Sequence, residues 1–139
     1  MVNIIILTHG EFGARLLECA ENIVGAQKEG VRNISVCPQN SLESIKSGLE
    51  QAVREMHSDD GLILLVDMPG GTPMNVAFPI VKDLPHCSVI CGVNVNMLIS
   101  AFTARKNLGF EKLSAKIVED GRRAICEVKS LLGGNGRIG

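Results

Sequence analysis

The chain has 139 residues, a length that fits one domain with a hydrophobic core of its own. Its formal net charge is -1 at pH 7 and it contains neither Trp nor Tyr, so we expect no nucleic-acid partner, because basic patches and stacking aromatic side chains are both missing. The apolar runs are too short to span a bilayer and no signal peptide opens the chain, which predicts a cytoplasmic protein.

Apolar strand-like runs alternate with stretches of helical periodicity, a pattern typical of α/β proteins with a parallel sheet. We predict an open, mostly parallel sheet of four or five strands with helices on both faces. The first strand is expected at residues 3–8, and the apolar spacing from Phe12 to Val24 predicts a helix after it. The second strand is expected at residues 33–37.

The next helix is predicted to have Asn40 as its N-cap, because Asn40 and Glu43 have the spacing of a capping box. Its buried face is expected to carry Leu42, Ile45, Leu49, Ala52, Val53 and Met56. A third strand at residues 62–67 is apolar until it ends in Asp67, which is typical of a strand covered on both faces. We expect this strand near the centre of the sheet.

Thr72 and Pro73 are predicted to be the N-cap and the first residue of a third helix, since proline is favoured at that first position. Pro79 should kink or end this helix, because it has no amide hydrogen to donate. A fourth strand is expected at residues 87–93, followed by a helix over about 97–106.

The apolar spacing over residues 110–132 predicts one helix with Gly121 inside it, and a terminal strand is the main alternative. Residues 1–132 are expected to form a single domain. The glycine-rich residues 133–139 are predicted to be a mobile tail.

The cysteines are odd in number and scattered through apolar segments, which predicts reduced, mostly buried thiols rather than a disulfide framework. Cys87 and Cys91 lie near His86, an arrangement that suggests a metal site. Yet side chains four residues apart on a strand are about 13 Å apart. We therefore expect thiols without a metal there.

Two short motifs stand at the ends of predicted strands: THGEFG, residues 8–13, at the end of the first strand, and DMPGGTP, residues 67–73, at the end of the third. His9 and Asp67 should meet if these two strands are neighbours, at the carboxyl edge of the sheet, where open α/β sheets bind ligands. Backbone amides at the starts of the next helices favour an anion there. The predicted anion-binding residues are Gly10, Glu11, Phe12, Gly70 and Gly71, whose glycines let the backbone approach a ligand closely.

A carboxylate bound to one imidazole nitrogen fixes the tautomer and leaves the other nitrogen free to attack. We therefore predict that His9 is a nucleophile, that Asp67 orients it and that the Thr72 hydroxyl donates to the bound anion. Each feature also has a structural interpretation: Thr72 as a helix cap, the glycine pair as a tight turn, and Asp67 as a cap for the next helix. His57 and His86 are expected to be structural or solvated.

Three ordered stretches carry a resemblance to a known family: residues 4–13 (IIILTHGEFG), 64–75 (LLVDMPGGTPMN) and 92–98 (GVNVNML). Over about residues 2–130 the chain resembles the IIA component of mannose-family sugar phosphotransferase systems. The resemblance implies that His9 accepts a phosphoryl group from the histidine phosphocarrier protein and passes it to a IIB component. It also implies that Asp67 orients the ring and that Thr72 contacts the phosphoryl group.

The resemblance further implies a homodimer that exchanges a C-terminal strand, and it implies no metal or organic cofactor. The IIB partner is expected to be a separate protein, and contact with a membrane is expected only through transporter subunits. Pro69, Met74 and Asn96 depart from the usual family pattern, which bears on the choice of partner.

Other functions stay open at this point. One is a regulatory protein whose His9 phosphorylation state is read by a partner, without a transporter. Another is the phosphotransferase subunit of dihydroxyacetone kinase, against which the motif at residues 67–73 argues. A hydrolase with His9 as general base lacks a separate nucleophile or metal set.

Overall fold

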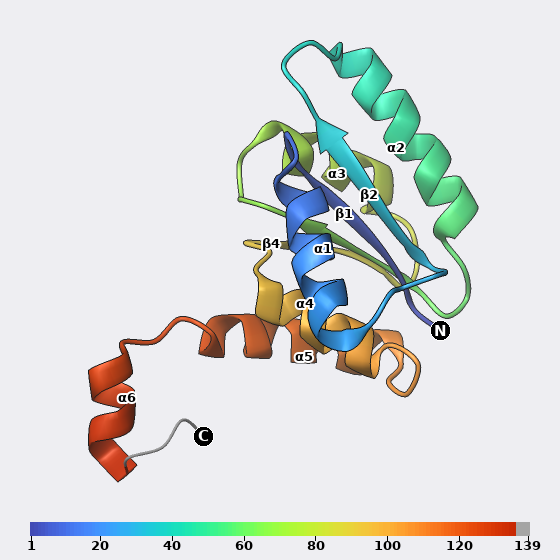
Figure 1. The fold of residues 1–139 in the computed structure, drawn as a ribbon. Helices are drawn as coiled ribbons and strands as arrows, with labels where there is room; N and C mark the ends of the chain where they lie inside the picture. Colours follow the sequence, from blue (N-terminus) through green and yellow to red (C-terminus); the bar gives the residue numbers. More distant parts are fainter. Residues whose placement is uncertain (136–139) are drawn as a thin grey trace.

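The computed structural model describes residues 1–135 of the chain. Within these residues, four strands form one sheet in the order β2-β1-β3-β4, and every neighbouring pair is parallel (Figure 1). The strands are β1 (Asn3–His9), β2 (Val31–Val36), β3 (Leu62–Val66) and β4 (Cys87–Cys91). The predicted open parallel sheet is confirmed, with β1 and β3 as its central neighbours.

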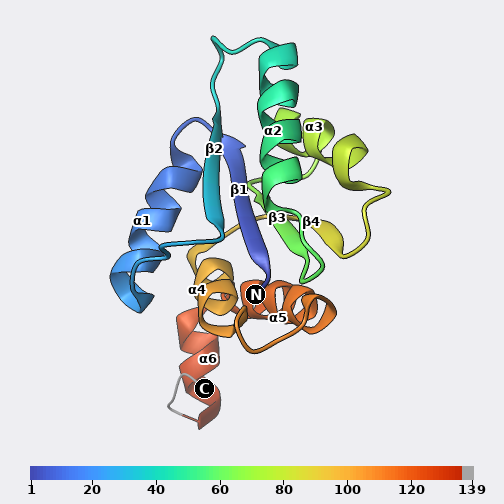
Figure 2. The ribbon, with the colours of Figure 1, turned by 90° about the vertical axis from the view of Figure 1, so that its right-hand side faces the viewer.

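Helices pack on both faces of the sheet, as predicted. One face is covered by α1 (Phe12–Val24), α4 (Val95–Ala104) and α5 (Phe110–Arg123). The other face is covered by α2 (Leu42–Met56) and α3 (Thr72–Val81). Figure 2 shows α1 on one side of the strands and α2 with α3 on the other. The last helix, α6 (Val128–Asn135), extends away from this body in both ribbon views.

The two hydrophobic cores follow from the alternation of side chains along the central strands. Ile4 and Ile6 of β1 lie in the core beneath α1, α4 and α5, whereas Ile5 and Leu7 lie in the core beneath α2 and α3. All five residues of β3 are buried, so the prediction of a strand covered on both faces is correct.

Two predicted helix caps are wrong by one residue. The N-cap of α2 is Ser41, whose hydroxyl accepts the Ser44 amide at 3.1 Å, while the Asn40 side chain accepts the Cys37 amide and closes the turn before it. The N-cap of α3 is Gly71, so Thr72 is the first helical residue and caps nothing. Several capping residues stand together at both places, and the path of the turn selects among them.

The predicted continuous helix over residues 110–132 is also wrong, because α5 ends at Arg123 and α6 begins at Val128. The Glu127 carboxylate accepts the amides of Lys129 and Ser130, which starts a new helix. Gly121 does lie inside α5, as predicted. A Cβ there would lie 2.5 Å from Met97 Cγ, so glycine allows α5 to pack closely against α4.

The C-terminal end of the chain also differs in part from expectation. Residues 133–135 form the end of α6, so the predicted boundary at residue 132 falls inside a helix. The rest of the predicted mobile tail, residues 136–139, lies outside the described residues.

In α3, Pro79 is followed by only two more helical residues. None of the helices within residues 1–135 is both long enough and apolar enough to cross a membrane.

The cysteines are free thiols in different environments. Burial raises the pKa of the Cys87 thiol to about 11. The pKa of Cys91 is also raised, mainly by burial and to a lesser extent by the negative charge of Asp67. Cys19 and Cys126 are exposed and Cys37, Cys87 and Cys91 are half-buried, so the prediction of mostly buried thiols is wrong. Across residues 1–135, no three His, Cys, Asp or Glu side chains are placed to hold a metal ion.

Candidate functional site

His9 and Asp67 meet at the carboxyl edge of the sheet, where β1 and β3 end side by side. The His9 Nδ1 atom lies 2.7 Å from Asp67 Oδ2, and the His9 amide donates to the same oxygen at 2.9 Å. The Met68 amide donates to the other carboxylate oxygen at 3.0 Å. In the sheet, β2 lies on one side of β1, whereas β3 and β4 lie on the other. The pair therefore lies where the strand order reverses.

The electrostatics of the pair determine which ring nitrogen is free. Burial alone would raise the pKa of Asp67, but hydrogen bonds from the His9 amide and ring outweigh it and lower that pKa below its usual value. The carboxylate is therefore ionised at neutral pH and accepts a hydrogen bond from Nδ1–H. In this tautomer Nε2 carries the lone pair, on a side chain that is 48% exposed.

The predicted glycine turn lies directly against the ring. A Cβ on Gly71 would lie 3.0 Å from His9 Cε1 and 3.6 Å from His9 Nε2, so a larger residue would push the imidazole aside. Gly70 has a φ of 80°, a left-handed conformation that favours glycine. The Asn75 side chain donates to the Gly70 carbonyl at 3.3 Å, which holds the turn onto α3.

Thr72 lies in the same open cleft as His9. The cleft has a volume of about 570 Å³ and is lined by His9, Gly10, Val36, Cys37, Pro38, Asn40, Leu42, Ile45 and Thr72. The Thr72 hydroxyl has no hydrogen-bond partner among the residues that the structure describes. It is thus free to donate to an anion in the cleft, which the cap interpretation would not allow.

The amides before α1 divide into two groups. The Gly10 amide donates to the Val36 carbonyl at 2.9 Å, so Gly10, with a φ of 52°, shapes the turn and has no free N–H for a ligand. The amides of Glu11 and Phe12 have no partner within residues 1–135. These two amides, and those of Gly71 and Thr72 at the start of α3, are the donors that remain open to an anion.

The other two histidines lie at the opposite, amino edge of the sheet. His57 Nε2 lies 2.7 Å from the Pro85 carbonyl oxygen. The His86 ring stacks on Phe110, with 5.7 Å between ring centroids. Neither histidine joins His9, as predicted.

Sequence reasoning missed Thr8, the residue before His9. Its side chain is fully buried and its hydroxyl accepts the Gly13 amide at 2.7 Å. A hydroxyl residue that ends an apolar strand, five positions before a glycine, is the signal that was available in the sequence.

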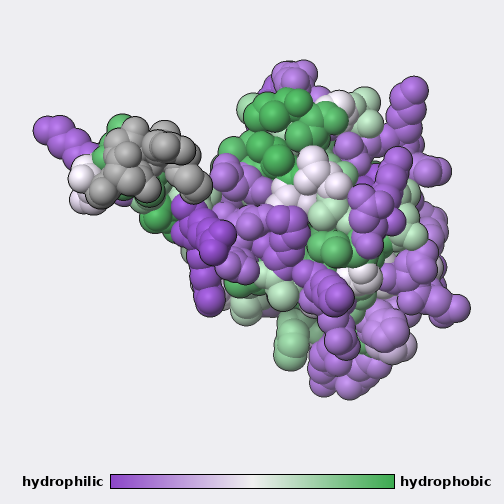
Figure 3. Space-filling model, turned by 90° about the horizontal axis from the view of Figure 1, so that it is seen from below, coloured by the Kyte–Doolittle hydropathy of each residue, from purple (hydrophilic) through white to green (hydrophobic). Residues whose placement is uncertain are grey.

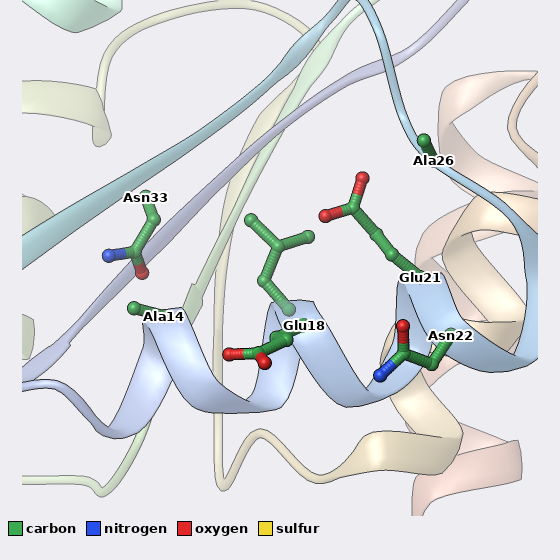
Figure 4. A pocket seen from close by; sticks show the side chains of 7 residues that line it. Ala14, Glu18, Glu21, Asn22, Ala26 and Asn33 are labelled. Atoms are coloured by element: carbon green, nitrogen blue, oxygen red, sulfur yellow. The ribbon is translucent and has the colours of Figure 1, made fainter.

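A second hollow, of about 380 Å³, lies beside α1 and away from the His9 pair (Figure 4). It is lined by Ala14, Leu17, Glu18, Glu21, Asn22, Ala26 and Asn33. The Glu21 carboxylate already accepts the Gln27 amide at 2.6 Å. Because this hollow contains neither His9 nor Asp67, it is no part of the candidate site.

Comparisons with known proteins show what the chain as a whole is similar to. Residues 3–118 match the family described as PTS system fructose IIA component. The chain is 35% identical over 130 residues to the PTS system mannose-specific EIIAB component of Escherichia coli K12, covering 93% of this chain and 40% of that protein. The chain therefore spans less than half the length of that relative.

Two further similarities cover most of both chains. The PTS system fructose-specific EIIA component of Bacillus subtilis is 25% identical over 113 residues, which is 81% of this chain and 77% of that protein. The crystal structure of phosphotransferase system component EIIA from Streptococcus agalactiae superposes with a TM-score of 0.84 at 26% identity, covering 94% of this chain and 99% of that one.

Proposed function

The chain belongs to the PTS system fructose IIA component family, and from this premise we propose that it is a cytoplasmic phosphocarrier. His9 accepts a phosphoryl group from the histidine phosphocarrier protein and passes it to a IIB component for sugar uptake. The observation that carries the proposal is the 2.7 Å contact between His9 Nδ1 and Asp67, which leaves Nε2 free in an open cleft.

The proposed reaction is a direct transfer between nitrogen atoms. The Nε2 lone pair attacks the phosphorus of the donor's phosphohistidine; a new N–P bond forms while the donor's N–P bond breaks, and the donor nitrogen keeps the electron pair. Both nitrogens of the His9 ring are then substituted, so the ring is positively charged. Asp67 stabilises that charge through Nδ1–H, and attack by the IIB nucleophile later returns the lone pair to Nε2.

The surroundings of Nε2 suit the negative charge of a phosphoryl group. The open amides of Glu11 and Phe12 at the start of α1, and of Gly71 and Thr72 at the start of α3, are donors at two helix N-termini. We assign the Thr72 hydroxyl to a phosphoryl oxygen. These donors are held by the fold before the group arrives, which is how electrostatic stabilisation contributes most to catalysis.

Labelling tests this function directly. Incubation with radioactive phosphoenolpyruvate, the first enzyme of the system and its histidine phosphocarrier protein should label one histidine with an acid-labile bond. His9→Ala should abolish the label, and His57→Ala, which changes a histidine outside the cleft, should retain it. Label that survives in His9→Ala would reject the assignment. A purified IIB component should then remove the label from the wild-type protein.

We also infer that the protein is a homodimer. Ile125 and Val128 are 83% and 53% exposed at the start of the extended C-terminal segment. A groove of about 610 Å³ lies between the outer edge of β4 and α5, with Ile90 and Val118 in its lining. Figure 3 shows apolar surface on both the body and the extended helix. A second copy, which offers the same exposed segment to the same groove, would cover both surfaces.

A further inference from the structure

Thr8 and His9 are consecutive residues of β1 whose side chains point to opposite faces of the sheet. Ile4 and Ile6 lie in the core beneath α1, so the alternation places Thr8 on that face as well. His9 falls on the other face, with Thr72 in its cleft. Thr8 is fully buried, whereas the His9 side chain is 48% exposed.

The Thr8 hydroxyl replaces the missing side-chain cap of α1. The residue in the N-cap position, Glu11, makes no side-chain hydrogen bond to the helix. The amide of Gly13, the second residue of α1, instead donates to Thr8 Oγ1 at 2.7 Å. This hydrogen bond lies in the interior, since Thr8 and Gly13 are both buried. The first turn of α1 is therefore fastened to β1 rather than to its own N-cap residue.

This hydrogen bond closes a short loop that contains the proposed phosphoryl acceptor. His9, Gly10, Glu11 and Phe12 all lie between the two bonded residues. The backbone of Gly13 packs closely against the Thr8 side chain, because a Cβ on Gly13 would lie 2.8 Å from Thr8 Oγ1. A second bond, from the Gly10 amide to the Val36 carbonyl, ties the same loop to β2. Both bonds fix the positions of the open amides relative to the His9 ring.

We propose that Thr8 is a positioning residue for phosphoryl transfer at His9, acting through the hydrogen bond that fixes the first turn of α1; the proposal rests on the function proposed above. Without the hydroxyl, the buried Gly13 amide has no acceptor, and the turn must move to find one. The amides of Glu11 and Phe12 then lose their spacing from Nε2. Small displacements of this kind reduce rates steeply, because transfer requires the reacting atoms to be aligned.

Thr8→Val, which removes the hydroxyl at nearly constant volume, is the informative change, and Thr8→Ser restores the hydroxyl. Ser100→Ala is the matched control, since Ser100 is also buried and its hydroxyl donates to Asp120 at 2.7 Å on the α4 to α5 contact. We expect Thr8→Val to slow transfer from the phosphocarrier by about 10- to 100-fold. Thr8→Ser and Ser100→Ala should transfer within about twofold of wild type, with thermal melts recorded for all variants.

A second readout needs no phosphoryl transfer. In NMR spectra of the unphosphorylated protein, Thr8→Val should shift the His9 ring nitrogens and the amides of Glu11 and Phe12, whereas Ser100→Ala should leave them in place. If the wild-type protein cannot be phosphorylated, the proposed function fails and these shifts alone decide the role of Thr8. Unchanged shifts in Thr8→Val, a wild-type transfer rate in that variant, or an equal loss of rate in Ser100→Ala would each overturn the proposal.

Discussion

Asp67 accepts hydrogen bonds from the ring and the amide of His9 and from the amide of Met68, so both carboxylate oxygens are used. An asparagine would fill the same volume, but its amide group can donate to Nδ1. That contact would place the ring proton on Nε2 and remove the lone pair that the proposed phosphoryl transfer uses. The negative charge of Asp67 is therefore as important as its shape.

We expect Asp67→Asn to fold and to slow phosphoryl transfer by about 10²- to 10⁴-fold, the range for a group that assists proton placement and charge stabilisation. Rapid-quench measurements with the phosphorylated carrier protein would give the rate. Asp120→Asn is the control, because Asp120 accepts hydrogen bonds from Ser100 and Lys116 on the α4 to α5 contact. A wild-type rate in Asp67→Asn would leave Asp67 with a structural role only.

Asp67 also links stability to pH. Burial opposes the effect, but the His9 hydrogen bonds hold the pKa of Asp67 below its usual value of 3.8. A carboxylate with a lowered folded-state pKa stabilises the protein above its unfolded-state pKa, and this contribution disappears as pH falls through the folded-state value. We therefore expect the stability difference between wild type and Asp67→Asn to persist down to about pH 5 and to shrink in stronger acid. Urea unfolding across this pH range measures it, and a difference that is undiminished in strong acid would contradict the prediction.

Substitutions at Thr72 and Ser41 distinguish a role in binding the phosphoryl group from a role in helix capping. Thr72 lines the cleft and caps nothing, so Thr72→Val should weaken transfer while leaving the melting temperature nearly unchanged. Ser41 caps α2 through its hydroxyl, so Ser41→Ala should cost about 1 kcal/mol of stability and leave transfer unchanged. Thermal melts and transfer rates on both variants distinguish the roles. A loss of stability with normal transfer in Thr72→Val would restore the capping interpretation.

At the scale of elements, periodicity located the helices and strands well, and their ends were located less well. Asn40 and Ser41 are both good capping residues, and only the turn that Asn40 closes on Cys37 leaves the cap to Ser41. The apolar spacing does not reveal the break after Arg123, because it continues through that break, while the Glu127 side chain starts the next helix. Local hydrogen bonds at helix ends decide what hydrophobic spacing leaves open.

Close packing between elements explains two glycines that local patterns left without a role. At Gly13, a Cβ would lie 2.5 Å from Asn33 Oδ1, so glycine allows α1 to pack directly on β2. At Gly121, a Cβ would meet Met97, so glycine brings α5 against α4. The Asn94 side chain reinforces the second contact by donating to the Gly121 carbonyl at 3.1 Å. Much of the third motif, at residues 92–98, thus serves helix packing.

At the scale of the whole molecule, the extended α6 and the open edge of β4 give a test of the inferred dimer. Sedimentation at micromolar concentration should show twice the 14.9 kDa chain mass. Removal of residues 124–139 should give monomers or insoluble protein, because the exposed apolar segment is lost. Removal of residues 136–139 alone is the control and should leave the dimer intact. A 14.9 kDa species for the full chain would reject the dimer, and dimers of the longer truncation would place the interface elsewhere.

The sequence by itself determined the α/β class and placed His9 and Asp67 after two apolar strands, because apolar runs and strand-terminal motifs are local. The two residues meet if those strands are neighbours, since parallel strands share one carboxyl edge, and the structure makes them neighbours. Only the tertiary structure decided how the helix-start residues divide their tasks. The Gly10 amide donates to the Val36 carbonyl, and the Thr72 hydroxyl stays free. The buried Thr8, on the face of β1 opposite His9, accepts the Gly13 amide at the start of α1. These assignments depend on which hydrogen-bond partners come within reach once the strands and helices are packed, and spacing along the chain does not fix that distance.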